Sequence, residues 1–267
     1  MANSRSGESV LQRAMRILEC FDADTPRLTA SQIAESTGLS RSTTHRLVTE
    51  MTSVGMLQRL DDGNLTVSVR SWETSVRCSP LEQLRELAKP VLEGLHRRFN
   101  HHICLAVPDF DSLSVLYLEH YDATYPLRIL SRHASRLSIH NNSAGLTMLA
   151  FGGEKAVNRV LNGSLPARVT GEPMDPSRVR ADLLQIRQQG YGHIVGGMVT
   201  ENTSFAVPCF DLTDGSVQCS LGLVARTDQC DHDEVLTTLI SAGRTLSRAL
   251  TEASTPEVPP IFLDKSA

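Results

Sequence analysis

Residues 28–57, LTASQIAESTGLSRSTTHRLVTEMTSVGML, decide the fold of the first part of this chain. Thr29 is a typical helix N-cap, and Gln32 completes a capping box three residues later, so a helix is predicted to begin here. Gly38 is placed to end that helix, because glycine adopts a positive φ without a Cβ clash. Ser40 then caps a second helix. Two short helices joined by a tight turn indicate a helix-turn-helix.

The second of these helices has a polar, cationic outer face. Its predicted inward residues, at helical spacing, are Thr43 or Thr44, Leu47, Val48 and Met51. The outer face carries no carboxylate before Glu50, which suits a helix laid in the DNA major groove. The candidate DNA contacts are Arg41, Ser42, Thr43, Thr44, His45, Arg46 and Thr49. An ordinary αα-hairpin with a solvated polar face is the alternative.

Sequences on both sides of this stretch complete a winged helix-turn-helix. Upstream, apolar residues at helical spacing from Val10 to Phe21 predict a helix that covers the pair. Downstream, Asp-Gly-Asn at 62–64 lies between alternating residues and predicts a β-hairpin, the wing. Arg59 and Asn64 on this wing are candidate contacts to phosphate or the minor groove.

Composition limits the class of protein. The chain has 267 residues, of which 40% are hydrophobic and 21% charged, so one large or two medium globular domains are expected. A net charge of −4 argues against broad polyanion binding. A DNA binder of this charge would depend on base contacts and on dimeric binding to two half-sites. There is no apolar run near the ~20 residues of a membrane helix and no signal-peptide core, so a cytoplasmic location without membrane contact is expected.

Cysteine and histidine positions give no pattern for a metal, a cofactor or catalysis. The six cysteines are scattered without a CxxC pair, as is typical of buried side chains in a reducing compartment. The adjacent His101 and His102 side chains should diverge, without cysteine or carboxylate at ligand spacing. No nucleophile motif surrounds Cys209 or Cys219. An enzyme is therefore not expected; a cysteine-dependent enzyme and a partner-binding module with degenerate DNA binding are the alternatives.

The rest of the chain has the pattern of a mixed α/β domain. A helix is predicted over 81–99, antiparallel strands over 103–108 and 113–119, and a third strand over 127–131. Further helices are predicted at 143–151, 156–161 and 233–251, and a second hairpin at 205–210 and 217–224. Asp175 should cap another helix that buries Val179, Leu183, Leu184 and Ile186.

From about Ser9 to Leu250, the chain resembles the IclR family of bacterial transcription regulators. The motifs that carry the resemblance lie at 9–19, 33–34, 37–43, 45–47, 137–140, 144–145, 149–150, 190–191, 206–211 and 215. The resemblance implies an α+β protein, in which a winged helix-turn-helix is joined by a linker helix to a GAF-like α/β effector-binding domain. It also implies an operator in double-stranded DNA, a small-molecule effector, and a homodimer or homotetramer.

The expected domain boundaries follow from these patterns. They are a disordered N-terminus at 1–8, the winged helix-turn-helix at 9–70, a partly helical linker at 71–80, the effector and oligomerisation domain at 81–254, and a disordered tail at 255–267.

The resemblance also implies an effector pocket, with departures from the family pattern. Its candidate residues are Ile129, Leu137, Ser143, Ala144, Ile194, Asn202, Ser204, Gly222, Leu223 and Val224. Gly197 and Glu201 reverse the family's acidic residue and glycine, and the inferred pocket is apolar, with Ser204 and Asn202 as its polar groups. A carboxylate there would be desolvated without compensation, so an aromatic or otherwise apolar effector is expected rather than a two- or three-carbon acid. A pocket filled by its own side chains is the alternative.

Overall fold

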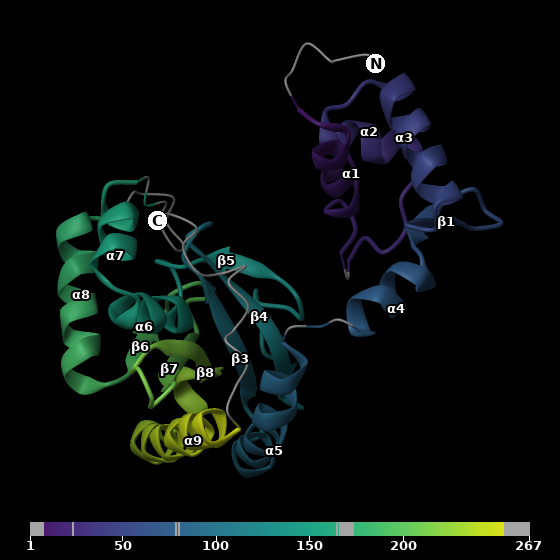
Figure 1. Ribbon diagram of the computed structural model, residues 1–267. Helices are drawn as coiled ribbons and strands as arrows, with labels where there is room; N and C mark the ends of the chain where they lie inside the picture. Colours follow the sequence, from purple (N-terminus) through teal and green to yellow (C-terminus); the bar gives the residue numbers. More distant parts are fainter. Residues whose placement is uncertain are drawn as a thin grey trace. The chain divides into compact units, whose positions relative to one another are not determined.

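The computed structural model describes residues 8–22, 24–77, 79, 81–163, 165 and 174–253. The chain divides into two compact units, Met1–Ser79 and Pro80–Ala267 (Figure 1). The tail expected at 255–267 lies outside the described residues, as does the N-terminus expected at 1–8 apart from Glu8. Among the helices of the described part, none is long and apolar enough to cross a membrane.

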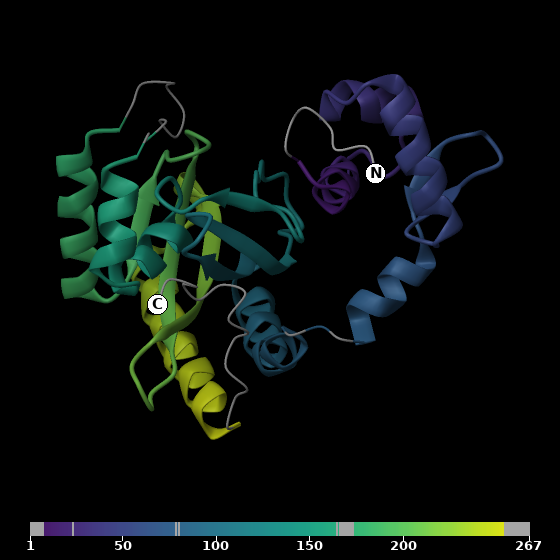
Figure 2. The ribbon, with the colours of Figure 1, turned by 45° about the horizontal axis from the view of Figure 1, so that its top comes forward.

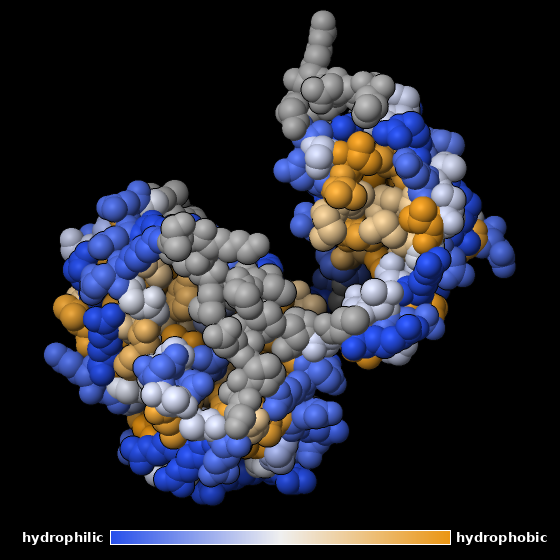
Figure 3. All heavy atoms as spheres, in the orientation of Figure 1, coloured by the Kyte–Doolittle hydropathy of each residue, from blue (hydrophilic) through white to orange (hydrophobic). Residues whose placement is uncertain are grey.

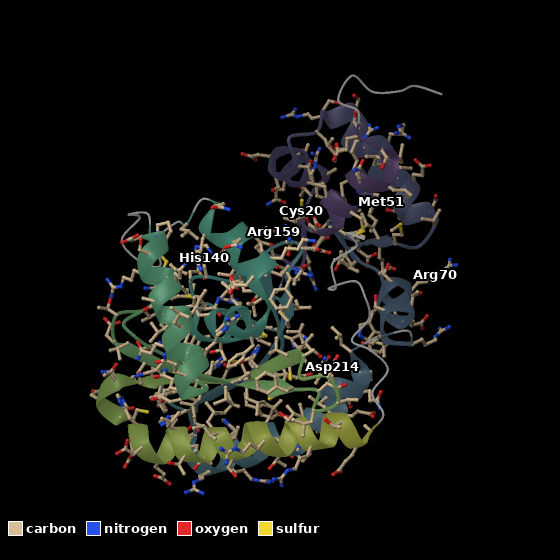
Figure 4. The ribbon with its side chains drawn as sticks, turned by 60° about the vertical axis from the view of Figure 1, so that its left-hand side comes forward. Cys20, Met51, Arg70, His140, Arg159 and Asp214 are labelled. Atoms are coloured by element: carbon tan, nitrogen blue, oxygen red, sulfur yellow. The ribbon has the colours of Figure 1, made fainter. Side chains whose placement is uncertain are left out.

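The first unit is a winged helix-turn-helix, as predicted. Its elements are α1 (Val10–Leu18), α2 (Ala30–Thr37), α3 (Arg41–Ser53), β1 (Leu57–Arg59), β2 (Leu65–Val67) and the linker helix α4 (Val69–Arg77). β1 and β2 pair antiparallel, and Leu28 forms an additional bridge to Leu65. Met51 of α3, labelled in Figure 4, is buried in the core beneath these elements.

Neighbouring residues determine where α2 begins and ends and where α3 begins. The Thr29 side chain accepts a hydrogen bond from the Gln32 backbone N–H, and the Gln32 side-chain oxygen accepts one from the Thr29 backbone N–H. Gly38 ends α2 with φ of 66°, and Ser40 caps α3. These three predictions are confirmed. The first helix is shorter than predicted, because its hydrogen bonding closes at Glu19 and leaves Phe21 outside.

The second unit is built on an antiparallel sheet of six strands in the order β5-β4-β3-β8-β7-β6. Its elements are α5 (Glu82–Phe99), β3 (His102–Asp109), β4 (Ser114–Tyr121), β5 (Arg136–Ser138), α6 (Ser143–Phe151), α7 (Glu154–Leu161), α8 (Pro176–Gln189), β6 (Gly192–Val195), β7 (Asn202–Phe210), β8 (Val217–Arg226), η1 (Thr227–Gln229) and α9 (His232–Glu252).

Helices cover both faces of this sheet (Figure 2). Because side chains alternate along a strand, Leu221 and Leu223 of β8 pack toward α5 and α9. Cys104 and Ala106 of β3 pack on the other face, toward α6, α7 and α8. The effector-domain architecture expected from the sequence is therefore present.

Two predictions about this unit were wrong, and one strand was missed. Residues 127–131 form no strand, because the edge of β4 is paired by Arg136–Ser138 instead. The short strand β6 was not predicted at all. Leu184 was expected to be buried, but 54% of it is exposed, since the apolar face of α8 is filled by Val179, Leu183 and Ile186.

Candidate DNA interface and effector cavity

The outer face of α3 presents most of the predicted DNA contacts to solvent. Arg41, Ser42, His45, Arg46 and Thr49 are exposed, and Thr43 is half-buried. The Arg46 guanidinium lies 3.1 Å from the Glu50 carboxylate one turn later. The first turn of α3 therefore presents the Arg41 cation and short hydroxyl side chains. The second cation of the helix, Arg46, is already paired with Glu50.

Thr44 is a correction to the predicted contacts. It is wholly buried, with 0% of its surface exposed. Its hydroxyl donates to the Ser40 carbonyl at 3.1 Å. Of the two threonines proposed as inward-facing, Thr44 is thus the core residue, and it cannot reach a DNA base.

The wing carries Arg59 and Asn64 beside acidic groups. Arg59 donates to the Gly63 carbonyl at 3.1 Å. The Asn64 backbone and side chain both donate to Asp62 at 2.9 Å, and these bonds lower the pKa of the Asp62 carboxyl. The nearby positive charge of Arg27 also lowers the pKa of Asp62. Arg27 was not among the predicted DNA contacts, because it precedes the helix-turn-helix.

A cavity of about 70 Å³ lies in the second unit. Seven predicted effector residues line it: Ile129, Leu137, Ser143, Ile194, Asn202, Ser204 and Val224. They come from β5, β6, β7, β8, the start of α6, and the loop before β5. The cavity therefore forms where the first turn of α6 meets the sheet face that α6, α7 and α8 cover.

The other three predicted residues do not line this cavity. Leu223 is fully buried in the core under α5 and α9, since it points to the opposite sheet face from Val224. Ala144 packs in the core between α6 and the sheet. At Gly222, a Cβ atom would come within 2.6 Å of Cys104 Sγ, so this glycine allows close packing of the adjacent strands.

The cavity is more polar than predicted. Tyr117, Arg128, Ser131, Asn141 and Asn142 also line it, so the expectation that Ser204 and Asn202 are its only polar groups was wrong. Tyr117 lies on β4, and the other four lie in the segments that flank β5. Gly197, Met198, Val199 and Leu130 complete the wall.

A buried hydrogen-bond chain joins the cavity to the N-terminus of α6. The Tyr117 hydroxyl donates to Asn142 Oδ1 at 3.1 Å, and burial holds the pKa of this phenol well above its usual range. Asn142 Oδ1 also accepts from the Gly145 N–H at 2.7 Å as the N-cap of α6. His140, labelled in Figure 4, immediately precedes this turn. A helix N-terminus favours an anionic group.

Arg128 is the cationic residue among those that line the cavity. Its side chain is exposed, and no ion pair with another described residue satisfies it. Its backbone carbonyl is fixed by Asn202, whose Nδ2 donates at 2.9 Å. The cavity thus combines apolar walls with a cation and amide groups, a combination that can bind an amphipathic anion.

Cys209 and Cys219 do not line this cavity. Cys209 and Cys219 are directly opposite each other on β7 and β8. A hydrogen bond from the Cys219 thiol to Cys209, together with burial, raises the pKa of Cys219 well above its usual range. A thiol held in this state is a poor nucleophile.

Both units of the chain match known protein domains. Residues 10–61 match the IclR helix-turn-helix domain, and residues 81–251 match the bacterial transcriptional regulator IclR C-terminal domain. The transcriptional regulator XynR of Escherichia coli K12 is 26% identical over 249 residues, covering 90% of this chain and 96% of XynR. The transcriptional repressor IclR of the same organism is 24% identical over 183 residues, covering 68% of this chain and 67% of the repressor.

A solved structure of a relative contains a ligand. The IclR homolog from Microbacterium hydrocarbonoxydans, crystallised with 4-hydroxybenzoate, is 33% identical, with a TM-score of 0.83. The match covers 92% of this chain and 100% of the homolog's chain. With both domain models matched in order, this chain belongs to the IclR family of bacterial transcription regulators, with a DNA-binding winged helix-turn-helix and a C-terminal effector-binding domain.

Proposed function

We propose that α3 binds operator DNA and that an aromatic carboxylic acid in the cavity of the second unit modulates this binding. The observation that carries the proposal is the composition of the cavity. Its apolar walls suit a ring, while Arg128 and the N-terminus of α6 suit a carboxylate. The relative crystallised with 4-hydroxybenzoate supports the same chemical class.

The effector differs from that expected from the sequence alone. Sequence analysis predicted that a carboxylate would be penalised for lack of polar partners. Arg128 and Asn141 supply N–H donors among the lining residues, so the cost of removing a carboxylate from water is offset by charge-assisted hydrogen bonds. The effector is therefore still expected to be aromatic, as predicted from the sequence, but it is now expected to carry a carboxylate as well.

Calorimetry with 4-hydroxybenzoate tests this proposal. We expect binding of 4-hydroxybenzoate and much weaker binding of pyruvate, which cannot fill the apolar walls. Arg128→Gln should reduce the affinity about tenfold, since a hydrogen bond to a charged group contributes roughly 1.5–3 kcal/mol. Arg97→Gln, on the exposed side of α5, is the matched control and should bind normally. Tight pyruvate binding without 4-hydroxybenzoate binding would refute the aromatic assignment.

For the DNA interface, we propose contacts from Arg41, Ser42, Thr43, His45, Arg46 and Thr49, with phosphate contacts from Arg59 and Asn64. The exposed first turn of α3 supports base contacts, because recognition helices read bases from their N-terminal residues. Asn64 must release its bond to Asp62 before it can contact DNA. The wing therefore contributes less than α3, and Arg59→Ala should weaken operator binding less than Arg41→Ala does in a gel-shift titration.

We also propose that the protein acts as a homodimer or homotetramer. Two helices of the first unit expose apolar residues: Val10, Leu11 and Met15 on α1, and Val69, Trp72 and Val76 on α4. Figure 3 shows a hydrophobic patch on this unit where α1 lies. Exposed apolar patches of this kind mark interaction sites. Leu11→Glu should shift the mass measured by light scattering toward the monomer, whereas Glu35→Gln on α2 should not.

A catalytic role is not part of the proposal. The relatives are transcription regulators, and the buried Cys219 thiol is held protonated by its surroundings. A cytoplasmic location is proposed with it, because operator DNA is reached there. Turnover of 4-hydroxybenzoate by the purified protein, absent in Cys209→Ala, would contradict the non-enzymatic assignment.

A further inference from the structure

The loop at residues 122–135 forms one wall of the effector cavity. It connects β4 to β5 and contains neither helix nor strand. Four consecutive residues of this loop, 128–131, line the cavity. Because Arg128 belongs to this set, the position of the loop determines where the cavity's cation lies.

Consecutive residues at the start of β3 hold the first half of this loop. Asn100 Nδ2 donates to Thr124 Oγ1 at 2.6 Å, and the Thr124 N–H donates to Asn100 Oδ1 at 3.1 Å. His101 Nδ1 lies 2.9 Å from the Tyr125 hydroxyl. The Asn-His-His sequence, without a metal-ligand pattern, thus has a different role: each residue anchors one residue of the loop.

The third anchor is the most buried. Only 1% of the His102 side chain is exposed, and its Nδ1 lies 2.9 Å from Asp122 Oδ1. Since a carboxylate accepts at Nδ1, that nitrogen carries the proton, and Nε2 is left as a bare lone pair. Nε2 is buried without a hydrogen-bond partner among the described residues. The neutral ring is therefore the form that fits this site.

We propose that His102 and Asp122 are positioning residues of the effector site: their hydrogen bond holds the 122–135 loop against the sheet, and acid weakens effector binding by breaking this arrangement. The inference rests on the proposed function, because it assumes that the effector occupies the cavity. Neither residue lines the cavity, so both act through Arg128 and its neighbours.

The charges around His102 give the direction of the pH effect. Burial lowers the pKa of His102, and the bond to Asp122 opposes this shift only in part. His120, whose ring centre lies 5.6 Å away, and His96 face it from β4 and α5 and disfavour a second positive charge. His133 of the loop lies against His120 with ring centres 6.2 Å apart.

When the 122–135 loop is held against the sheet, which we call the closed state, the lowered pKa of His102 means that its ring binds a proton less readily. When the loop is released, the ring binds a proton more readily. The closed state is therefore fully favoured above the ordinary histidine pKa of about 6.5 and loses stability as the pH falls below it. Burial lowers the pKa of His101 as well, so the Tyr125 anchor responds to acid in the same direction.

Two measurements on the full-length protein test the proposal. Hydrogen exchange of the 123–131 amides, without effector and at one fixed pH, reports whether the loop is held. Calorimetry with 4-hydroxybenzoate at pH 7.5 and 5.8 reports binding; the carboxyl group of this probe stays ionised over that range. The variants are Asp122→Ala, His102→Gln and the control Asp111→Ala, an exposed aspartate in another loop of the same unit.

We expect Asp122→Ala to accelerate exchange of the loop and to weaken 4-hydroxybenzoate binding about tenfold at pH 7.5. Because Asp122 is 69% exposed, this variant should fold even if His102→Gln does not. His102→Gln retains a donor to Asp122 without a titratable ring, so its affinity should fall less at pH 5.8 than that of the wild type, which falls several-fold; only the His101 anchor is then left to respond to acid. Asp111→Ala should match the wild type.

Unchanged loop exchange in Asp122→Ala would overturn the proposal, and so would faster exchange with unchanged affinity. Equal pH dependence in His102→Gln and the wild type would refute the acid-sensitive part. If the wild type does not bind 4-hydroxybenzoate at all, the proposed effector class fails, while the exchange measurement still decides whether His102 and Asp122 hold the loop.

Discussion

The two units of this protein differ in how directly their sequences encode their sites. In the DNA-binding unit, the functional face lies on one continuous helix whose ends are fixed by neighbouring residues, such as Ser40 and Gly38. In the effector unit, the cavity is assembled from five strands, the start of one helix and three connecting segments. A site on one helix follows from local periodicity, whereas a site between elements depends on which sheet face each residue occupies.

The largest change in stability is expected for Gly145→Ala, which tests how tightly the effector unit is packed around its cavity. Gly145→Ala would place a Cβ atom within 2.2 Å of the Ile139 carbonyl oxygen, so the first turn of α6 would have to move. We expect the free energy of unfolding to fall by about 3 kcal/mol. Urea unfolding measures it.

Gly94→Ala in α5 is the matched control, because a Cβ atom at Gly94 meets nothing within 4 Å. Alanine should stabilise that helix by about 0.5–1 kcal/mol. Similar unfolding free energies for the two variants would show that α6 is free to adjust, and would contradict the close packing inferred for the cavity wall.

A second pair of variants separates packing from recognition within the DNA-binding unit. Thr44→Ala removes a buried methyl group and hydroxyl and should cost about 1 kcal/mol of stability. Thr43→Ala should leave stability unchanged and weaken operator binding by about 1 kcal/mol. Thermal unfolding and gel-shift titration measure the two effects. The reverse result would mean that α3 is rotated relative to its described orientation.

The two units should also respond differently to acid. Burial lowers the pKa of His101, His102 and His193 in the effector unit. Because the unfolded chain then binds protons more readily, this unit should lose stability as the pH falls from 7.5 to 5.5. The DNA-binding unit contains one histidine, His45, and it is exposed.

Hydrogen exchange can follow the two units separately, through the amides of β3 and of α3. After correction for intrinsic exchange rates, we expect a smaller loss of protection than Gly145→Ala causes, and we expect it in β3 only. An equal loss in both units would show that the buried histidines are not responsible.

Little change in stability is expected at the exposed pair of Arg46 and Glu50. Both side chains are more than half exposed, at 57% and 58%, so Glu50→Gln should change stability by less than about 0.5 kcal/mol. Operator affinity should nevertheless rise, because the carboxylate no longer competes with phosphate for Arg46. Decreased affinity at every salt concentration would instead make Glu50 a DNA contact.

The contrast between the units also explains which predictions succeeded. Thr29, Gln32 and Gly38 act within a few residues of one another, so their capping roles could be predicted directly. Leu223 was misplaced because the family resemblance identifies a strand but not the face on which each residue lies. Arg128 was missed because its loop has the alternation of a strand, and only the pairing of β4 with residues 136–138 excludes that interpretation.

The most direct test of the account is selection of operator DNA from a random library at near-physiological salt, with the wild-type protein and Arg41→Ala in parallel. The account predicts a palindromic or repeated motif for the wild type, and loss of that motif in a variant that remains folded. Recovery of the same motif with Arg41→Ala, or no enriched sequence with folded wild-type protein, would contradict the assignment of α3 as the element that reads DNA.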